Sequence, residues 1–174
     1  MEIIYSGRKK MSNSAQSMLA IGALMIFSLI SMRFDSVVLQ NTEVEVENKV
    51  YLTAFSLADD LLEEIKQRAF DQQTGDFKSI TPEALTASVS LGKEPGEEWP
   101  NFNDIDDYNN YTKPISLPHA ENYSIISKVT YAQESDQNQI STTQTYYKRV
   151  EIIVDSPYMR NQLKMYYIFT LHSK

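Results

Sequence analysis

The chain has 174 residues, a formal net charge of −7 and no cysteine, and 42% of its residues are hydrophobic. This length fits one domain with an attached segment, and the hydrophobic fraction can support a modest core. The negative charge argues against a nucleic-acid-binding protein, because such proteins carry a clustered basic face. Without cysteines, an exported domain would rely on packing for its stability, with or without a bound metal.

An uncharged stretch near the N-terminus, Met11–Met32, follows a basic cluster at residues 8–10 and ends before Arg33. As a helix it would be about 33 Å long, enough to cross the hydrocarbon layer of a bilayer, although its strongly apolar part, residues 18–32, would span only about 22 Å. The basic cluster is expected to stay in the cytoplasm, which places the chain after Arg33 outside. The alternative is a cleaved secretory signal, but no Ala-x-Ala-like cleavage site follows the stretch.

Methionines recur at every seventh position of this stretch. They are Met11, Met18, Met25 and Met32, with Leu39 and Val46 next in phase. A seven-residue repeat keeps one seam of a helix facing partner helices. Ala15 and Gly22 lie beside the seam and would let another backbone approach closely. We therefore expect helix packing through this seam, although methionine is also common in membrane helices that make no such contact.

Arg33 and Asp35 are two charged residues just after the apolar stretch. They allow two interpretations. They could form an ion pair between adjacent subunits, or they could anchor the helix at the membrane surface, which is the common role of charges at this position.

Residues 33–70 contain no proline or glycine, and their apolar residues recur at helical spacing. The segment Glu43–Glu47 alternates with a period of two and contains β-branched valines, which are features of a strand. Because helical patterns flank it on both sides, we expect it to be helical. The sequence thus predicts a basic leader over residues 1–13 and one long helix over residues 14–70, far longer than the usual globular helix.

Glycines and prolines interrupt residues 71–119 repeatedly, which predicts an irregular crossover. Thr81 and Pro82 are expected to begin one short helix, as its N-cap and first residue. Aromatic and aliphatic residues are expected to hold the rest of the crossover against the domain. They are Phe77, Trp99, Phe102, Ile105, Tyr108 and Tyr111.

Residues 120–174 alternate between apolar and polar in three runs, which predicts an antiparallel sheet of three to four strands. In the second run the predicted apolar face consists of Tyr146, Val150, Ile152 and Val154. The outer half of the long helix is expected to cover the apolar face of the sheet. The predicted fold class is therefore α+β.

No motif of an enzyme occurs, and His119 and His172 have no nucleophile at a spacing that suggests catalysis, so we expect no enzymatic activity. An acidic run in the crossover could instead supply oxygen ligands to calcium. These candidate ligands are Asp104, Asp106, Asp107 and Asn109. The competing interpretation is a solvated acidic turn that Tyr108 anchors to the sheet. Apart from this calcium, no cofactor is expected.

The order of these parts resembles that of type IV pilin-like proteins, which include type IV pilins and the pseudopilins of type II secretion. Their plan is a short basic leader, a long helix in two parts, an irregular crossover and a C-terminal antiparallel sheet. Local segments are also similar to those of pilin-like proteins. They are Phe70–Asp71, Asp104–Asn109 and Tyr147–Tyr158.

The resemblance implies a structural subunit that polymerises through its apolar helix into an extracellular or envelope-spanning filament. It would be stored in the cytoplasmic membrane and passed to a pilus or secretion assembly machinery. If a leader is removed, the best cleavage site is Ala15–Gln16, where Ala20 stands in place of the glutamate that pilins carry. The alternatives are a membrane-anchored ectodomain that binds a ligand or partner, and a minor or tip subunit.

Overall fold

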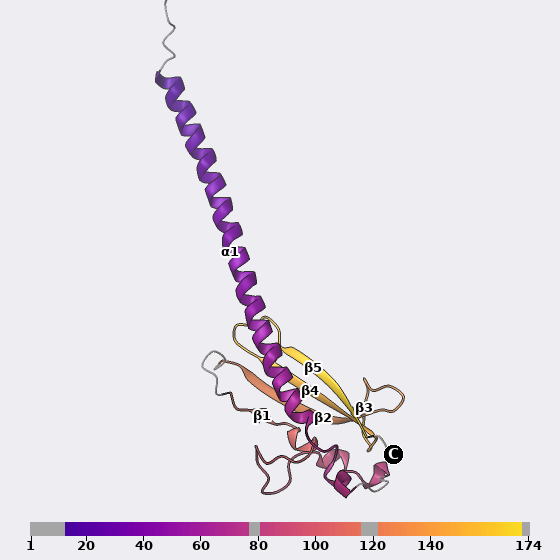
Figure 1. Cartoon of the computed structure of the whole chain (residues 1–174). Helices are drawn as coiled ribbons and strands as arrows, with labels where there is room; N and C mark the ends of the chain where they lie inside the picture. Colours follow the sequence, from indigo (N-terminus) through magenta and orange to yellow (C-terminus); the bar gives the residue numbers. More distant parts are fainter. Residues whose placement is uncertain (1–12, 77–80, 116–121, 172–174) are drawn as a thin grey trace, which may run out of the picture. The chain divides into compact units, whose positions relative to one another are not determined.

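The structure is a computed structural model that describes residues 13–76, 81–115 and 122–171. It contains one long helix, α1, followed by short 3₁₀ helices and five strands (Figure 1). The helix is α1 (Asn13–Lys66), and the strands are β1 (Thr112–Lys113), β2 (Ser124–Ala132), β3 (Ile140–Ser141), β4 (Tyr147–Asp155) and β5 (Leu163–Thr170). The chain divides into two compact units, Met1–Val46 and Glu47–Lys174, so α1 contributes to both.

Helix α1 is continuous through the segment 43–47, as its helical flanks predicted. It ends at Lys66 and not at Phe70, which corrects the predicted boundary. The reason is a long-range backbone pairing just after the helix. The N–H of Ala69 donates to the carbonyl of Asn103 at 3.2 Å, and the Ala69 carbonyl accepts from the N–H of Ile105 at 3.0 Å. These bonds use backbone groups that a longer helix would have needed for itself.

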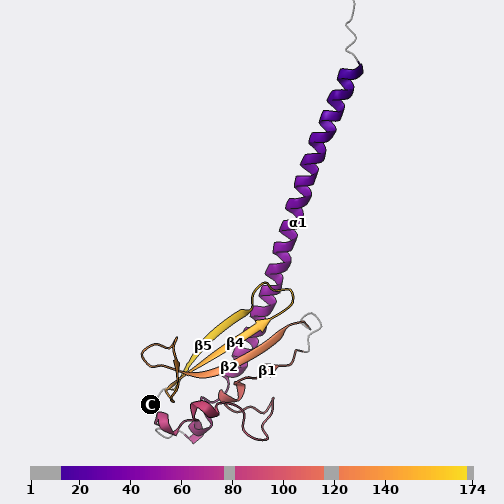
Figure 2. The same ribbon diagram turned by 180° about the vertical axis from the view of Figure 1, so that it is seen from behind.

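The sheet is antiparallel, with the order β1-β2-β4-β5 (Figure 2). Strand β3 pairs with β2. Strands β2, β4 and β5 are the three predicted runs, and they form the expected meander. The register places Val129 opposite Val150, and Val150 opposite Tyr167. The two-residue strands β1 and β3 were not predicted, because they are too short to show a periodic pattern.

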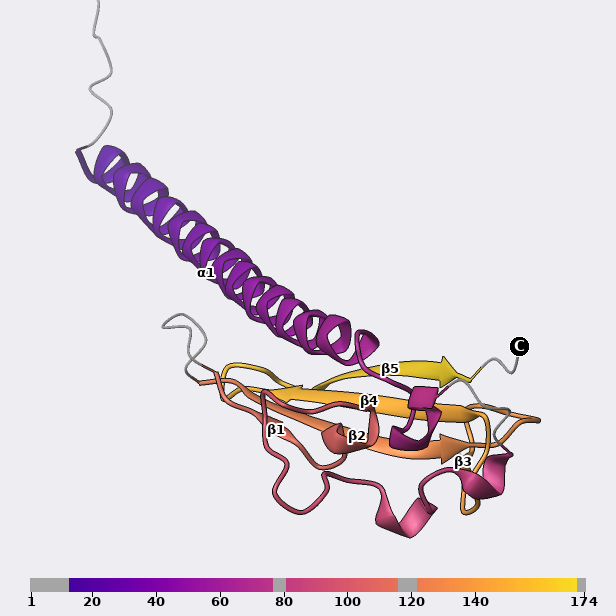
Figure 3. The same cartoon turned by 60° about the horizontal axis from the view of Figure 1, so that its bottom comes forward.

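The apolar face of the sheet lies against the part of α1 that belongs to the second unit (Figure 3). Ala58, Leu61 and Ile65 of the helix are fully buried in a core that includes Val129 and Val150 of the sheet. This packing confirms the predicted α+β layout, in which a helix covers one face of an antiparallel sheet.

The described part of the crossover is ordered around an aromatic cluster, as predicted. Phe102 and Tyr108 are buried, and their rings meet edge to face with centroids 5.0 Å apart. Trp99 differs from the prediction because it is 44% exposed and donates a hydrogen bond from its indole to Glu64 at 2.8 Å. Thr81 precedes the short 3₁₀ helix Pro82–Ala84 as expected, but its side chain makes no capping hydrogen bond. Phe77 lies outside the described residues.

Candidate functional site

The first unit presents a row of exposed apolar side chains along α1. Met18 and Met32 are each 74% exposed and Met25 is 64% exposed, and residues on the other faces of the helix, such as Leu19 and Phe27, are similarly exposed. Every residue from 14 to 46 is exposed except Gly22 and Ser31, which are partly buried. An apolar surface of this extent is unusual for a soluble protein that acts alone.

Among the described residues, α1 is also the one helix that is long and apolar enough to cross a membrane. No part of its apolar stretch is buried by the described residues of the chain. The helix is therefore compatible with a membrane anchor.

The structure places the other predicted assembly residues along the same exposed helix. Ala15 is exposed, and a Cβ added at Gly22 would meet no described atom within 4 Å. Arg33 and Asp35 are both exposed, and no ion pair joins them in the described part of the chain. Met11 lies outside the described residues. The described members of this set are thus exposed, apart from Gly22, which is partly exposed.

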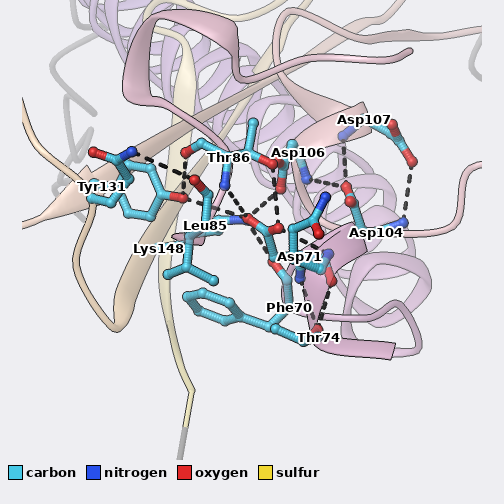
Figure 4. A network of polar contacts seen from close by, with 12 residues as sticks. Phe70, Asp71, Thr74, Leu85, Thr86, Asp104, Asp106, Asp107, Tyr131 and Lys148 are labelled. Atoms are coloured by element: carbon cyan, nitrogen blue, oxygen red, sulfur yellow. Dashed lines mark hydrogen bonds and ion pairs between the residues drawn. The ribbon is translucent and has the colours of Figure 1, made fainter. Parts of the chain in front are cut away.

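The second unit contains a buried ion cluster centred on Lys148 of β4 (Figure 4). The Lys148 ammonium donates to Asp71 at 2.9 Å, to the carbonyl of Phe70 at 2.6 Å, and to Asp106. Lys148 and Asp71 are both fully buried, and Asp106 is 2% exposed. Two acids around one lysine leave this cluster with a formal charge of −1.

The surroundings of Asp71 explain how the cluster tolerates that charge. Its carboxylate also accepts the backbone N–H groups of Gln73 at 3.1 Å and Thr86 at 3.0 Å. The Tyr131 hydroxyl donates to the Thr86 carbonyl at 2.8 Å, and burial together with the nearby Asp71 charge raises the pKa of Tyr131. Hydrogen bonds to a carboxylate are among the stronger ones in proteins, so Asp71 fixes the chain that follows α1.

Lys148 was not predicted as a site residue. It lies on the buried, otherwise apolar face of β4. The buried positions of β4 are Lys148, Val150, Ile152 and Val154. The same period-two pattern includes residue 148, so the position itself was readable from the sequence. A lysine is rarely buried without a counter-charge, and its partners come from two distant segments that the pattern does not connect.

The acidic run of the crossover is buried, which corrects the prediction of a solvated turn. Asp104 is fully buried, and Asp106 and Asp107 are each 2% exposed. Tyr108 does anchor the run, because it is fully buried and its carbonyl accepts a hydrogen bond from the Ser127 hydroxyl of β2 at 2.7 Å.

The four predicted calcium ligands have different neighbours. Asp106 points to Lys148, whereas one oxygen of Asp104 accepts the N–H of Asp106 at 2.9 Å. The side-chain oxygen of Asn109 accepts a hydrogen bond from the N–H of Val129 at 3.0 Å, and its side-chain NH₂ group donates to the carbonyl of Leu91. Asp107 lies close to two carboxylates from outside the four, those of Glu94 and Glu97.

A second charged network ties the crossover to α1 through Glu64. Its carboxylate accepts hydrogen bonds from Lys113, Trp99 and Tyr108, at 2.9, 2.8 and 2.9 Å. Burial alone would raise the pKa of Glu64, but these hydrogen bonds and the charge of Lys113 outweigh it, so the pKa is lowered. Glu64 is therefore an ionised anchor at neutral pH.

Because Asp104 is protonated in the folded state, the protein is expected to lose stability as the pH rises from about 4 to about 8 in buffer without divalent cations. Burial, followed by the charges of Asp106 and Asp107, raises the pKa of Asp104 to about 8. In the unfolded chain an aspartate titrates near pH 3.9, so between these values the folded state binds more protons and rising pH favours unfolding.

This pH effect can be measured by denaturant unfolding of the full chain in detergent micelles, followed by the emission of its single tryptophan, Trp99. Asp104→Asn should reduce the pH dependence without abolishing it, because burial also raises the pKa of Asp107. Asp60→Asn, at an exposed position of α1, should leave the pH dependence unchanged. A wild-type midpoint that rises over the same pH range would contradict the assignment.

Comparisons with protein-family models, with curated proteins and with solved structures give no match to this chain.

Proposed function

We propose that the protein is a structural subunit of a type IV pilus-like helical filament, and that it polymerises through the apolar half of α1. The observation that carries the proposal is the exposed, unbroken apolar helix with its seven-residue seam of Met18, Met25 and Met32. Before assembly this segment would lie in the cytoplasmic membrane, with the second unit outside the cell. In the filament, the helices of other subunits would replace lipid around it.

The driving force for this exchange follows from the chemistry of the seam. Lipid tails and a helix bundle are similarly apolar, so hydrophobic burial contributes little to the transfer. Close packing must supply the gain, and the small residues Ala15 and Gly22 permit it. One heterologous contact repeated without closure gives an open helical polymer. A pilus or secretion assembly machinery would carry out the transfer.

The buried ion cluster and the Glu64 network support the same function in a different way. They fix the crossover to both α1 and the sheet, so the second unit would be a rigid body that is added repeatedly without changing shape. A filament of either kind, an extracellular pilus or a secretion pseudopilus, requires such a unit.

Shearing of cells that express the protein, followed by negative-stain electron microscopy and immunolabelling, tests the proposal. We expect labelled threads in the sheared fraction. If the protein stays entirely in the membrane fraction and no labelled thread is seen, the proposal is wrong, and the membrane-anchored ectodomain becomes the better interpretation. Label confined to the ends of threads would instead indicate a minor or tip subunit.

A further inference from the structure

The crossover brings together three carboxylates that the sequence analysis did not group. Glu94 and Glu97 are the ends of a β-turn, in which the N–H of Glu97 donates to the carbonyl of Glu94 at 3.1 Å. Pro95 and Gly96 occupy its centre, and Gly96 has a φ of +91°, which favours glycine at the third position of a type II turn. Asp107 comes from the 3₁₀ helix Asp106–Tyr108. One carboxylate oxygen of each acid lies within 4.8 Å of the others.

Two buried oxygens of this group have no hydrogen-bond partner. Asp107 is only 2% exposed, and its Oδ1 is unpartnered among the described residues, as is the Oε2 of Glu94. The other oxygen of Asp107 accepts hydrogen bonds from the N–H groups of Asn103 and Asp104. A buried polar atom without a partner is rare in folded proteins and calls for a missing ligand.

The charge of the group is likewise unbalanced. In the part of the chain that the structure describes, no ion pair includes Glu94, Glu97 or Asp107, and the nearby Lys93 pairs with Glu98 at 3.9 Å. Carboxylates at this spacing repel one another unless protons or a cation bind between them.

We propose that Glu94, Glu97 and Asp107 bind a divalent cation, with Ca²⁺ as the ion whose chemistry fits. Ca²⁺ prefers hard oxygen ligands at about 2.4 Å, so it can bridge oxygens up to about 4.8 Å apart. Asp107 also lines a surface cavity of about 420 Å³ together with Trp99 and Tyr111, which offers the ion a path from solvent. Water or backbone carbonyls would complete the coordination.

The site differs from the calcium ligands expected from sequence, because it shares only Asp107 with them. All three acids belong to the unit Glu47–Lys174. The inference therefore does not depend on whether the protein forms filaments, and each proposal can fail alone.

Calorimetric titration of the full chain in detergent micelles with CaCl₂, after treatment with a chelator, tests the inference. We expect one Ca²⁺ per chain with a Kd of about 10⁻⁴ to 10⁻³ M. Glu97→Gln and Asp107→Asn should each weaken binding by at least about tenfold. Glu83→Gln is the matched control, because Glu83 is an exposed acid of the same crossover that lies outside the group and does not line the cavity, so it should not change the Kd.

Trp99 emission establishes that each variant is folded before it is titrated. Two results would overturn the inference. One is the absence of heat with millimolar CaCl₂ in the wild type, and the other is wild-type affinity in both the Glu97→Gln and the Asp107→Asn variants.

Discussion

Lys148→Met is expected to lower the free energy of unfolding by about 3–5 kcal/mol. The substitution keeps the length and apolar stem of the side chain but removes the ammonium that Asp71 and Asp106 share. Both carboxylates would then be buried without a counter-charge, which is the situation that makes broken buried ion pairs so costly. The ammonium also lies 4.7 Å from the centroid of the Phe70 ring, so a cation–π contact is lost as well.

Denaturant unfolding of the full chain in micelles, followed by Trp99 emission, measures this loss. Lys128→Met is the matched control, because Lys128 lies on the exposed face of the neighbouring strand β2 and its loss should cost less than about 0.5 kcal/mol. Combining Lys148→Met with Asp71→Asn and Asp106→Asn should recover part of the stability, since the uncompensated charges are then gone. A loss below about 1 kcal/mol for Lys148→Met would show that the cluster is not an important source of stability.

Periodicity predicted the elements of the fold but not their ends. The helical pattern on both sides of Glu43–Glu47 correctly outweighed the local preference for a strand. By contrast, the end of α1 depends on the pairing of Ala69 with Asp104, a contact between residues far apart in sequence. The residue types at 67–70 do not predict this pairing, because it is made by backbone groups, which are the same in every residue.

For the Lys148 cluster and the group of Glu94, Glu97 and Asp107, the sequence likewise predicts where a residue lies but not which residues it contacts. The strand pattern places Lys148 on the buried face, and the Pro95–Gly96 pair indicates a turn that joins Glu94 to Glu97. Neither the strand pattern nor the turn predicts which carboxylates Lys148 or the two glutamates contact. Asp106 and Asp107 are adjacent, yet one faces Lys148 and the other faces the two glutamates. That choice is set by the tertiary packing of the crossover.

Gly22→Leu tests most directly whether the seam of α1 joins subunits. A Cβ added at Gly22 meets no described atom of the chain within 4 Å, so leucine there should leave the folded subunit and its membrane insertion intact. If Gly22 allows close approach of a neighbouring helix, leucine there should prevent it. Loss of about 1.4 kcal/mol at each contact reduces association about tenfold, so we expect at least this reduction in filament yield.

Ala23→Leu is the matched control, since Ala23 is an exposed small residue that lies about 100° around the helix from Gly22 and about 160° from Met25. The measurement compares the amount of each variant in the sheared filament fraction with its amount in the membrane fraction. We expect Gly22→Leu to remain in the membrane and to form few or no threads, whereas Ala23→Leu should form threads like the wild type. Normal filaments from Gly22→Leu, or equal defects in both variants, would contradict the seam.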